Sequence, residues 1–361
     1  MSKVSTMVGM ASSTDFIGLD LSDRTGTYVV ISAEGEVVRE GKLALTQAGL
    51  CKAFGTRPAA RIAIEVGAHS PWVSRALSQL EYTVTVANPR QVKLIFAAHK
   101  KNDRLDAEHL ARLLRMDAAL LRPVSHRGET AQADLALLRS RDVLVRTRTQ
   151  LVNSARGMVK AVGGRLPRCS TQSFHLKVKD HLPQMLRPAL EPVLQSIASL
   201  TEQIRIATRQ LEQLAAERYP ETIVLRRIRG VGVITALCFV LTLEEPQRFS
   251  KSRSVGAFVG LTTRQHDSGE SQPQLRITKA GDPFLRRVLI QSAQYIMGPF
   301  GEDCELRRWG LSLMRGGGNK VLKRKAVVAV ARKLAVLMHH LWLNGEVYEP
   351  FYQAKLKEEA A

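Results

Sequence analysis

The chain has 361 residues, with 53 Lys or Arg against 33 Asp or Glu, which gives a formal net charge of +20. Hydrophobic residues make up 45% of it, enough to build real cores and to exclude a largely disordered protein. The excess positive charge favours nucleic acid as the partner over an acidic membrane surface, and no uninterrupted apolar run approaches the roughly 18 residues of a membrane span.

The first residues and the cysteines carry no functional signal. Residues 1–14 have no sustained apolar core, which makes a poor signal peptide and predicts a disordered tail. The four cysteines are far apart and form no Cys-x-x-Cys pair. A zinc site is therefore not expected. The expected location is a reducing compartment, the cytoplasm.

Residues 15–125 follow strand and helix patterns in turn. Three strands come first, and "ARIAIEVG" and "TVTVANP" predict two more. Helices are expected around Leu50, over "SPWVSRALSQLEY" and over "NDRLDAEHLARLL". This order predicts an α/β domain of the ribonuclease H-like kind, in which helices flank a mixed sheet.

Four carboxylates fall where this fold brings residues to one side of the sheet. Asp20 lies on the first strand, Glu65 ends the fourth, and Asp103 and Asp106 begin the last helix. An acid in the first helical turn is common because the helix dipole favours negative charge there, which would by itself explain the last two. The four together suit Mg²⁺, or Mn²⁺, held against a phosphodiester. The sequence therefore predicts a catalytic, metal-binding set of Asp20, Glu65, Asp103 and Asp106.

Residues 126–220 are expected to form long helices with a coiled-coil seam. Between Arg139 and Arg168 there are eight Lys or Arg and one acid, which favours a face that follows phosphates over a merely solvated one. In the second helix, apolar residues alternate at spacings of four and three, as in a coiled coil. The seam residues are Val193, Ile197, Leu200, Ile204, Ala207, Leu211 and Leu214. Their partner is either the preceding helix of the same chain or a second copy.

Residues 221–345 are expected to form a mostly α-helical domain, followed by a tail over 346–361. The segment "LRRIRGVGVITALCFVLTL" (225–243) resembles half of a helix-hairpin-helix element, whose glycine N–H groups approach a phosphate. A packing corner that needs glycine is the simpler interpretation. The residues predicted to contact nucleic acid across the chain are Arg139, Arg141, Arg146, Arg148, Arg156, Arg229, Gly230, Gly232, Arg264, Lys279, Arg286 and Arg287.

A glycine-flanked loop follows, in "GLTTRQHDSGESQPQLRITKAGDPFLRRVL", and contains Ser268. A loop serine usually serves a turn. Here Arg264, His266, Lys279 and Arg286 surround it and could hold a phosphate. A serine hydroxyl needs a base or a metal to become a nucleophile, which the four carboxylates would supply. Ser268 is thus the predicted nucleophile, and Ser271 is the second choice.

The motifs "GLDLSD", "AIEVGAHS", "KNDRLDAEHLARL", "IRGVG", "DSGES" and "ITKAGDPFLRRVL" together resemble the DEDD transposases of insertion-sequence family 110, over about residues 15–345. The resemblance implies a RuvC-like N-terminal domain with Asp20, Glu65, Asp103 and Asp106 as metal ligands. It implies a C-terminal transposase domain with Ser268 as the catalytic serine. It further implies site-specific recombination of donor and target DNA, through a phosphoserine link and a Holliday junction.

The same resemblance implies partners. A structured non-coding RNA of the element, called bridge RNA, would pair with donor and target DNA and so read their sequences. Homodimers would join into a tetramer, with a composite site from the RuvC-like part of one subunit and the serine domain of another. The expected location is the bacterial cytoplasm, in association with the nucleoid.

Three other interpretations stand beside this one. A RuvC-type Holliday-junction resolvase or nuclease would use water as its nucleophile and leave Ser268 structural. A non-catalytic RNA- or DNA-binding scaffold would explain the charge but leave the acids without a role. An actin-like ATPase would share "GLDLS" but needs a second, glycine-rich phosphate loop of the Asp-x-Gly type, which we do not find.

Overall fold

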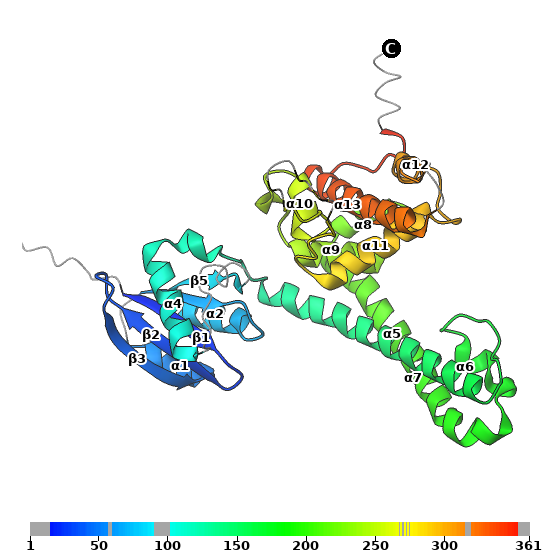
Figure 1. Ribbon diagram of the computed structural model, residues 1–361, viewed down its shortest axis with the longest axis horizontal. Coiled ribbons are helices and arrows are strands. Elements are labelled where there is room, and N and C mark those ends of the chain that lie inside the picture. The colour runs from blue at the N-terminus through cyan, green and yellow to red at the C-terminus, as the bar shows by residue number, and fades with distance from the viewer. Residues whose placement is uncertain are drawn as a thin grey trace, which may run out of the picture. The chain divides into compact units, whose positions relative to one another are not determined.

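The computed structural model divides into two compact units, with the division between Arg127 and Gly128 (Figure 1). Each unit is described by itself. The tail expected at 1–14 and the last residues of the tail expected at 346–361 lie outside the described residues. The structure describes residues 15–56, 60–89, 102–266, 268, 271, 273, 275–314 and 319–352.

A mixed sheet of five strands forms the centre of the first unit (Figure 1). The strand order is β3-β2-β1-β4-β5; β1 and β3 each run antiparallel to β2, whereas β1, β4 and β5 run parallel. This mixed sheet with flanking helices agrees with the ribonuclease H-like architecture expected from the sequence. The strands are β1 (Phe16–Leu21), β2 (Thr25–Ile31), β3 (Val37–Ala44), β4 (Arg61–Glu65) and β5 (Thr83–Ala87).

Helices cover both faces of this sheet. On one face, α1 (Gln47–Phe54) and α2 (Ser70–Gln79) pack against the apolar side chains of β1 and β4. On the other face lies α4 (Asp103–Met116), which packs on β1, β2 and β4. A Cβ atom at Gly18 would lie only 1.9 Å from the carbonyl oxygen of Ala107, so this glycine allows α4 to approach the sheet closely.

A long helical hairpin begins the second unit. Helices α5 (Glu129–Ala161) and α7 (Arg187–Arg218) lie side by side and run antiparallel, and the short α6 (Phe174–Lys177) lies near their far end (Figure 1). The predicted seam faces α5 of the same chain: most of its residues are buried, and Arg141 Nε donates to Thr208 Oγ1 at 2.7 Å across the hairpin. The partner that the sequence left open is therefore the preceding helix.

The base of the hairpin shares one hydrophobic core with the C-terminal helices. Leu138 of α5 and Leu211 of α7 belong to the same buried cluster as the apolar helix α9. The helices expected over 126–220 are thus continuous in packing with those expected over 221–345. The C-terminal helices are α8 (Glu221–Leu225), α9 (Val233–Leu243), α10 (Arg253–Phe258), α11 (Pro283–Met297), α12 (Glu305–Ser312) and α13 (Lys320–Asn344).

Part of the expected C-terminal tail is folded. The backbone N–H of Glu305, at the start of α12, donates to the carbonyl oxygen of Pro350 at 2.9 Å. The guanidinium of Arg308 lies 4.8 Å from the centre of the Phe351 ring, a cation–π distance. Residues 346–352 therefore pack on the second unit.

Among the described residues, α13 is the one helix long and apolar enough to cross a membrane. Its apolar residues do not form an uninterrupted run in the sequence, because Arg332 and Lys333 divide them. Half of its most apolar stretch is buried inside the unit, where Val330, Leu334 and Met338 belong to the main core. Burial in this core explains its apolar character.

Candidate functional site

Asp20 and Glu65 lie at the same end of two paired strands. Strands β1 and β4 are parallel, and their last registered pair is Leu19 with Ile64, so Asp20 and Glu65 are the next residues of each strand. Neighbouring strands are about 4.8 Å apart, and successive side chains alternate between faces. Leu19 and Ile64 pack on the side of α1 and α2. Asp20 and Glu65 therefore point to the face that carries α4.

The direction of α4 brings its first turn to this end of the sheet. Gly18 lies closest to Ala107, whereas Phe16, two residues earlier in β1, also packs on the cluster that contains Leu113 and Leu114, further along the helix. The helix thus runs opposite to β1, and its N-terminus lies toward the strand ends. Asp103 and Asp106 are the acids of this first turn. The fold therefore directs all four predicted carboxylates to one end of the sheet.

The cap of α4 holds these acids in a helical turn. The Asn102 side chain accepts a hydrogen bond from the backbone N–H of Arg104 at 3.0 Å, which satisfies one of the free donors at the helix start. The N-terminal end of the helix dipole stabilises the negative charge of Asp103 and Asp106. The structural role that the sequence allowed for these two acids is therefore present, and it does not conflict with a second role.

The nearest arginine of α4 is engaged away from the two aspartates. Arg104 donates to Glu40 of β3 at 2.7 Å and to Glu108 at 3.0 Å. Burial would raise the pKa of Glu108, but Arg112 and Arg104 together hold it below its usual value. Within the described part of the chain, no cation forms an ion pair with Asp103 or Asp106.

The donor set has the chemistry of a magnesium site but is not a closed cage. Among the described residues, no three Asp, Glu, His or Cys side chains are gathered tightly enough to hold a metal ion. Mg²⁺ commonly takes one or two protein carboxylates and completes its octahedron with water and substrate phosphates. Four carboxylates directed to one end of a sheet fit that mode of binding.

Sequence reasoning gave no role to His69, which follows β4 by four residues. Its Nδ1 accepts a hydrogen bond from Trp72 Nε1 at 3.1 Å, and its Nε2 lies 3.7 Å from Asp23 Oδ1 in the turn after β1. Because the indole N–H can only donate, the proton of a neutral His69 must be on Nε2. His69 is only four residues from Glu65, within "EVGAHS", and this closeness in sequence was the signal that could have marked it as a residue near the carboxylates.

Ser268 is exposed on the loop that joins α10 to α11 in the second unit. Near the start of the loop the chain pairs with itself, since Thr263 and Ile277 form an antiparallel bridge. Further out, Ser268 and Ser271 exchange backbone hydrogen bonds of 3.2 and 3.0 Å. The serine predicted as nucleophile and the second choice are thus paired with each other through their backbones, and Ser268 is exposed.

The base of this loop is fixed by two glycines and an arginine. Gly260 and Gly281 have φ angles of +71° and +68°, a left-handed conformation in which other residues are strained. A Cβ at Gly281 would lie 2.0 Å from the carbonyl oxygen of Phe258. Arg286 donates to the carbonyl oxygens of Val259 and Ala280, one on each side of the loop. Arg286, predicted to hold a phosphate, therefore closes the loop.

Asp282 connects the loop to α11. Its carboxylate accepts hydrogen bonds from the N–H groups of Phe284 and Leu285 at 2.7 and 3.0 Å and pairs with Arg139 at 2.7 Å. Burial would raise the pKa of Asp282, but the bond from Leu285 and the charge of Arg139 hold it below its usual value. Arg139, predicted to bind nucleic acid, thus stabilises the start of this helix.

The other predicted arginines of α5 also have partners inside the protein. Arg148 is 5% exposed and donates to Thr201, and Arg141 donates to Thr208. Arg156 donates to the carbonyl oxygens of Leu166 and Pro167. These side chains stabilise the hairpin. The cations of this stretch that remain exposed and unpaired among the described residues are Lys160, Arg165 and Arg168.

One aspartate holds two more of the predicted cations. Asp142 pairs with Arg146 at 3.0 Å and with Arg287 of α11 at 2.5 Å. In the turn before α9, Arg229 pairs with Glu302 at 3.1 Å. Of the cations predicted to contact nucleic acid, Arg264 and Lys279 are exposed in the loop that contains Ser268, and their side chains have no hydrogen bond or ion pair within the described part of the chain.

The glycine turn at 230–232 joins α8 to α9. Gly230 has a φ of +93° and packs against Tyr295 and Ile296 of α11, as the packing-corner interpretation requires. Gly232 precedes α9, and a Cβ there would meet no atom within 4 Å. The turn therefore combines a packing role at Gly230 with an open backbone at Gly232.

Comparison with known proteins covers both units. The family model of IS110 DEDD transposases matches residues 17–163, and that of the transposase IS116/IS110/IS902 family matches residues 223–303. The transposase for insertion sequence element IS1328 of Yersinia enterocolitica is 31% identical over 341 residues, which is 92% of this chain and 98% of that protein. The chain belongs to the IS110 family of transposases.

Two further relatives agree. The transposase for insertion sequence element IS1111A of Coxiella burnetii is 29% identical over 272 residues, or 72% of this chain and 71% of that protein. A probable family 20 transposase of Pseudomonas aeruginosa is 26% identical over 92% of this chain and 98% of that protein. This IS110-family transposase is therefore an enzyme that acts on DNA. The first matched region contains all four carboxylates, and the second contains the Ser268 loop.

Proposed function

We propose that this transposase cleaves and rejoins DNA with Asp20, Glu65, Asp103 and Asp106 as ligands of Mg²⁺, or Mn²⁺. The observation that supports this most is the direction of β1, β4 and α4, which brings acids far apart in the sequence to one end of the sheet. The metal, when bound, supplies positive charge that stabilises the phosphoryl oxygens in the transition state. The carboxylates hold it against the scissile phosphodiester.

Ser268 is the proposed nucleophile. Its Oγ attacks the phosphorus of one DNA strand, a serine–phosphate ester forms, and the bond from phosphorus to the leaving deoxyribose oxygen breaks. The hydroxyl proton passes to a base at the site, and the leaving oxygen takes up a proton. Attack by a hydroxyl of another strand reverses the step, releases Ser268 and joins the new strands. The exposure of Ser268 on its loop fits this role, with Ser271 as the second choice.

The partners are proposed on the family and the charge. The donor and target DNA would be recombined through a Holliday junction, and a structured guide RNA would select both by base pairing. Homodimers that assemble to a tetramer would build the site from the acids of one subunit and the serine of another. A net charge of +20 suits a protein that binds two polyanions in the bacterial cytoplasm near the nucleoid.

The nucleophile is tested by comparing Ser268→Ala with Ser271→Ala. We expect Ser268→Ala to abolish both recombination and the covalent protein–DNA adduct seen on denaturing gels, whereas Ser271→Ala should retain both. The two serines are exposed and three residues apart, so both substitutions should disturb the structure of the loop equally. Retained cleavage by Ser268→Ala would instead support a RuvC-type nuclease that uses water.

The carboxylate site is tested by Asp103→Asn with a titration of Mg²⁺. We expect cleavage to fall about a hundredfold to a thousandfold, a loss typical of removing a group that stabilises transition-state charge. Binding of DNA should hardly change, because the acid does not contact phosphate without the metal. Cleavage that needs no divalent metal, or is unaffected in Asp103→Asn, would contradict the proposal. A protein that binds but never cleaves would be the non-catalytic scaffold.

A further inference from the structure

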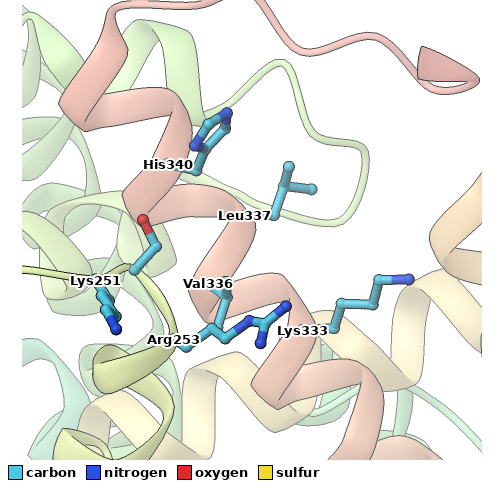
Figure 2. Close-up of a pocket in the computed structure, with 7 residues that line it drawn as sticks. Lys251, Arg253, Lys333, Val336, Leu337 and His340 are labelled. Carbon is cyan, nitrogen blue, oxygen red and sulfur yellow. The ribbon is translucent and has the colours of Figure 1, made fainter. Parts of the chain in front are cut away.

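A hollow of about 490 Å³ opens on the second unit, between the segment before α10 and the last turns of α13 (Figure 2). It is separate from the Ser268 loop and contains none of the residues predicted from the sequence. The residues that line it are Lys251, Ser252, Arg253, Lys333, Val336, Leu337 and His340.

The lining is basic and contains no acid. Lys251 and Arg253 come from one wall and Lys333 from the other, as Figure 2 shows. Elsewhere on this unit, exposed arginines such as Arg205 and Arg308 pair with neighbouring carboxylates. In the described part of the chain, no carboxylate lies within ion-pair distance of Lys251 or Arg253. An anion in the hollow would be attracted by these positive charges, which no carboxylate in the described part of the chain neutralises.

The two remaining basic groups are partly engaged. The Lys333 ammonium lies 4.6 Å from the centre of the Trp309 ring, a cation–π contact that orients the lysine side chain without neutralising its charge. His340 Nε2 lies 3.3 Å from Glu346, at the rim. The anion-binding capacity of the hollow therefore rests on Lys251 and Arg253, with Lys333 as the third cation.

A buried histidine fixes the wall that carries Lys251 and Arg253. His339 is fully buried on α13, with its Nε2 2.9 Å from the carbonyl oxygen of Pro246 and its Nδ1 2.9 Å from Ser252 Oγ. Because a carbonyl oxygen only accepts, Nε2 carries the proton, and the Nδ1 of the neutral ring accepts from the Ser252 hydroxyl. These two hydrogen bonds hold residues 246–252, at both ends, against α13. The wall of the hollow is therefore formed before any ligand binds.

We infer that this hollow binds the sugar–phosphate backbone of a nucleic acid. Phosphate oxygens would contact Lys251, Arg253 and Lys333, and the apolar face of a sugar would lie on Val336 and Leu337. The lining has no Phe, Tyr or Trp for a base to stack on, which favours backbone contact over recognition of a base. The inference rests on the action of this transposase on DNA, and it adds a contact that neither the four acids nor Ser268 provides.

The test is the full-length double variant Lys251→Gln/Arg253→Gln, measured for affinity to duplex DNA and to a stem-loop RNA over a range of salt concentrations. Loss of two phosphate contacts should lower the slope of log affinity against log salt by about two units. A decrease with only one of the two polymers identifies which backbone the hollow takes. The charge-conserving Lys251→Arg/Arg253→Lys should keep the wild-type slope.

The matched control is Lys179→Gln/Arg209→Gln, which removes two exposed cations from the helical hairpin of the same unit and changes the net charge equally. The inference is overturned if the hollow variant keeps the wild-type slope with both polymers, or if the control lowers it as much. Both pairs of side chains are exposed, so thermal melting should not change. This test does not depend on the catalytic proposal, because it measures nucleic-acid binding and not cleavage. Ser268→Ala should therefore show the wild-type salt dependence of binding.

Discussion

The carboxylates of the first unit and the serine of the second are held in different ways. Asp20 and Glu65 are placed by strand register, and the acids of α4 by packing of a helix on a glycine. Ser268 lies on a loop that is fixed at its base by Gly260, Gly281 and Arg286 and is exposed further out. A rigid sheet end suits a site that must hold a cation in one geometry, whereas an exposed loop suits a group that must reach a substrate.

The first unit should be the more sensitive to small changes in backbone packing. Gly18→Ala would place a Cβ 1.9 Å from the Ala107 carbonyl oxygen and 2.7 Å from the Ala111 nitrogen, so α4 must move outward. We expect a loss of about 3 kcal/mol in the free energy of unfolding, typical of overpacking against backbone. DNA cleavage should be lost as well, since Asp103 and Asp106 move with the helix. Urea unfolding and a cleavage assay measure the two effects.

Gly67→Ala is the matched control for this change. Gly67 lies two residues after Glu65, and a Cβ there would meet no atom within 4 Å. The free energy of unfolding should change by less than about 0.5 kcal/mol. Equal losses in the two variants would show that the packing of α4 on β1 is not what places the acids.

The helix that follows the Ser268 loop should respond to pH. Asp282→Ala removes two hydrogen bonds to the first turn of α11 and the ion pair with Arg139, and we expect a loss of about 2 kcal/mol at pH 7. Because the pKa of Asp282 is lowered in the folded protein, its contribution is complete above the ordinary Asp pKa and is lost as the pH falls.

The difference in stability between wild type and Asp282→Ala should therefore shrink below about pH 4. Asp282→Asn retains a cap acceptor for Phe284 and Leu285 and should lose less. Urea unfolding at several pH values checks both expectations. A difference that stays constant down to pH 3 would show that the charge of Asp282 does not matter.

The smallest expected loss of stability comes from removing a helix N-cap. Comparing the cap of α4 with that of α13 separates the effect on stability from the effect on cleavage. Asn102→Ala removes the hydrogen bond to Arg104 N–H and should cost about 1 kcal/mol. Asn319→Ala removes the equivalent cap of α13 in the second unit, where Asn319 accepts from Val321 N–H at 2.9 Å. The two variants should lose similar stability, but only Asn102→Ala should slow cleavage, because it loosens the turn that carries Asp103 and Asp106.

The sequence was sufficient to predict the sheet of the first unit and the strand ends where Asp20 and Glu65 lie. Strand alternation and the order of elements are local signals, and parallel strands place their C-terminal ends together whatever the loops do. The close approach of α4 at Gly18 was not predicted, because a glycine inside "FIGLDL" has the same appearance whether or not a helix lies above it.

The arginines of α5 show why counting charge along a helix is insufficient. Arg141 and Arg148 are seven residues apart, on the same stripe as the buried Val152, Ala155 and Val159, and this stripe faces α7. The count of eight cations included them without regard to the face on which each lies. Considering the helical phase together with the α7 seam would have placed both arginines in the hairpin.

The hairpin of α5 and α7 has a consequence for how the second unit unfolds. A helix of 33 residues is about 50 Å long, and its two ends belong to different hydrophobic clusters. Val152, Phe174 and Leu190 form the far cluster, whereas Leu138 and Leu211 belong to the main one. The far end can open while the base stays closed, so its amide hydrogens should exchange with solvent before those of α9, in two separate cooperative steps.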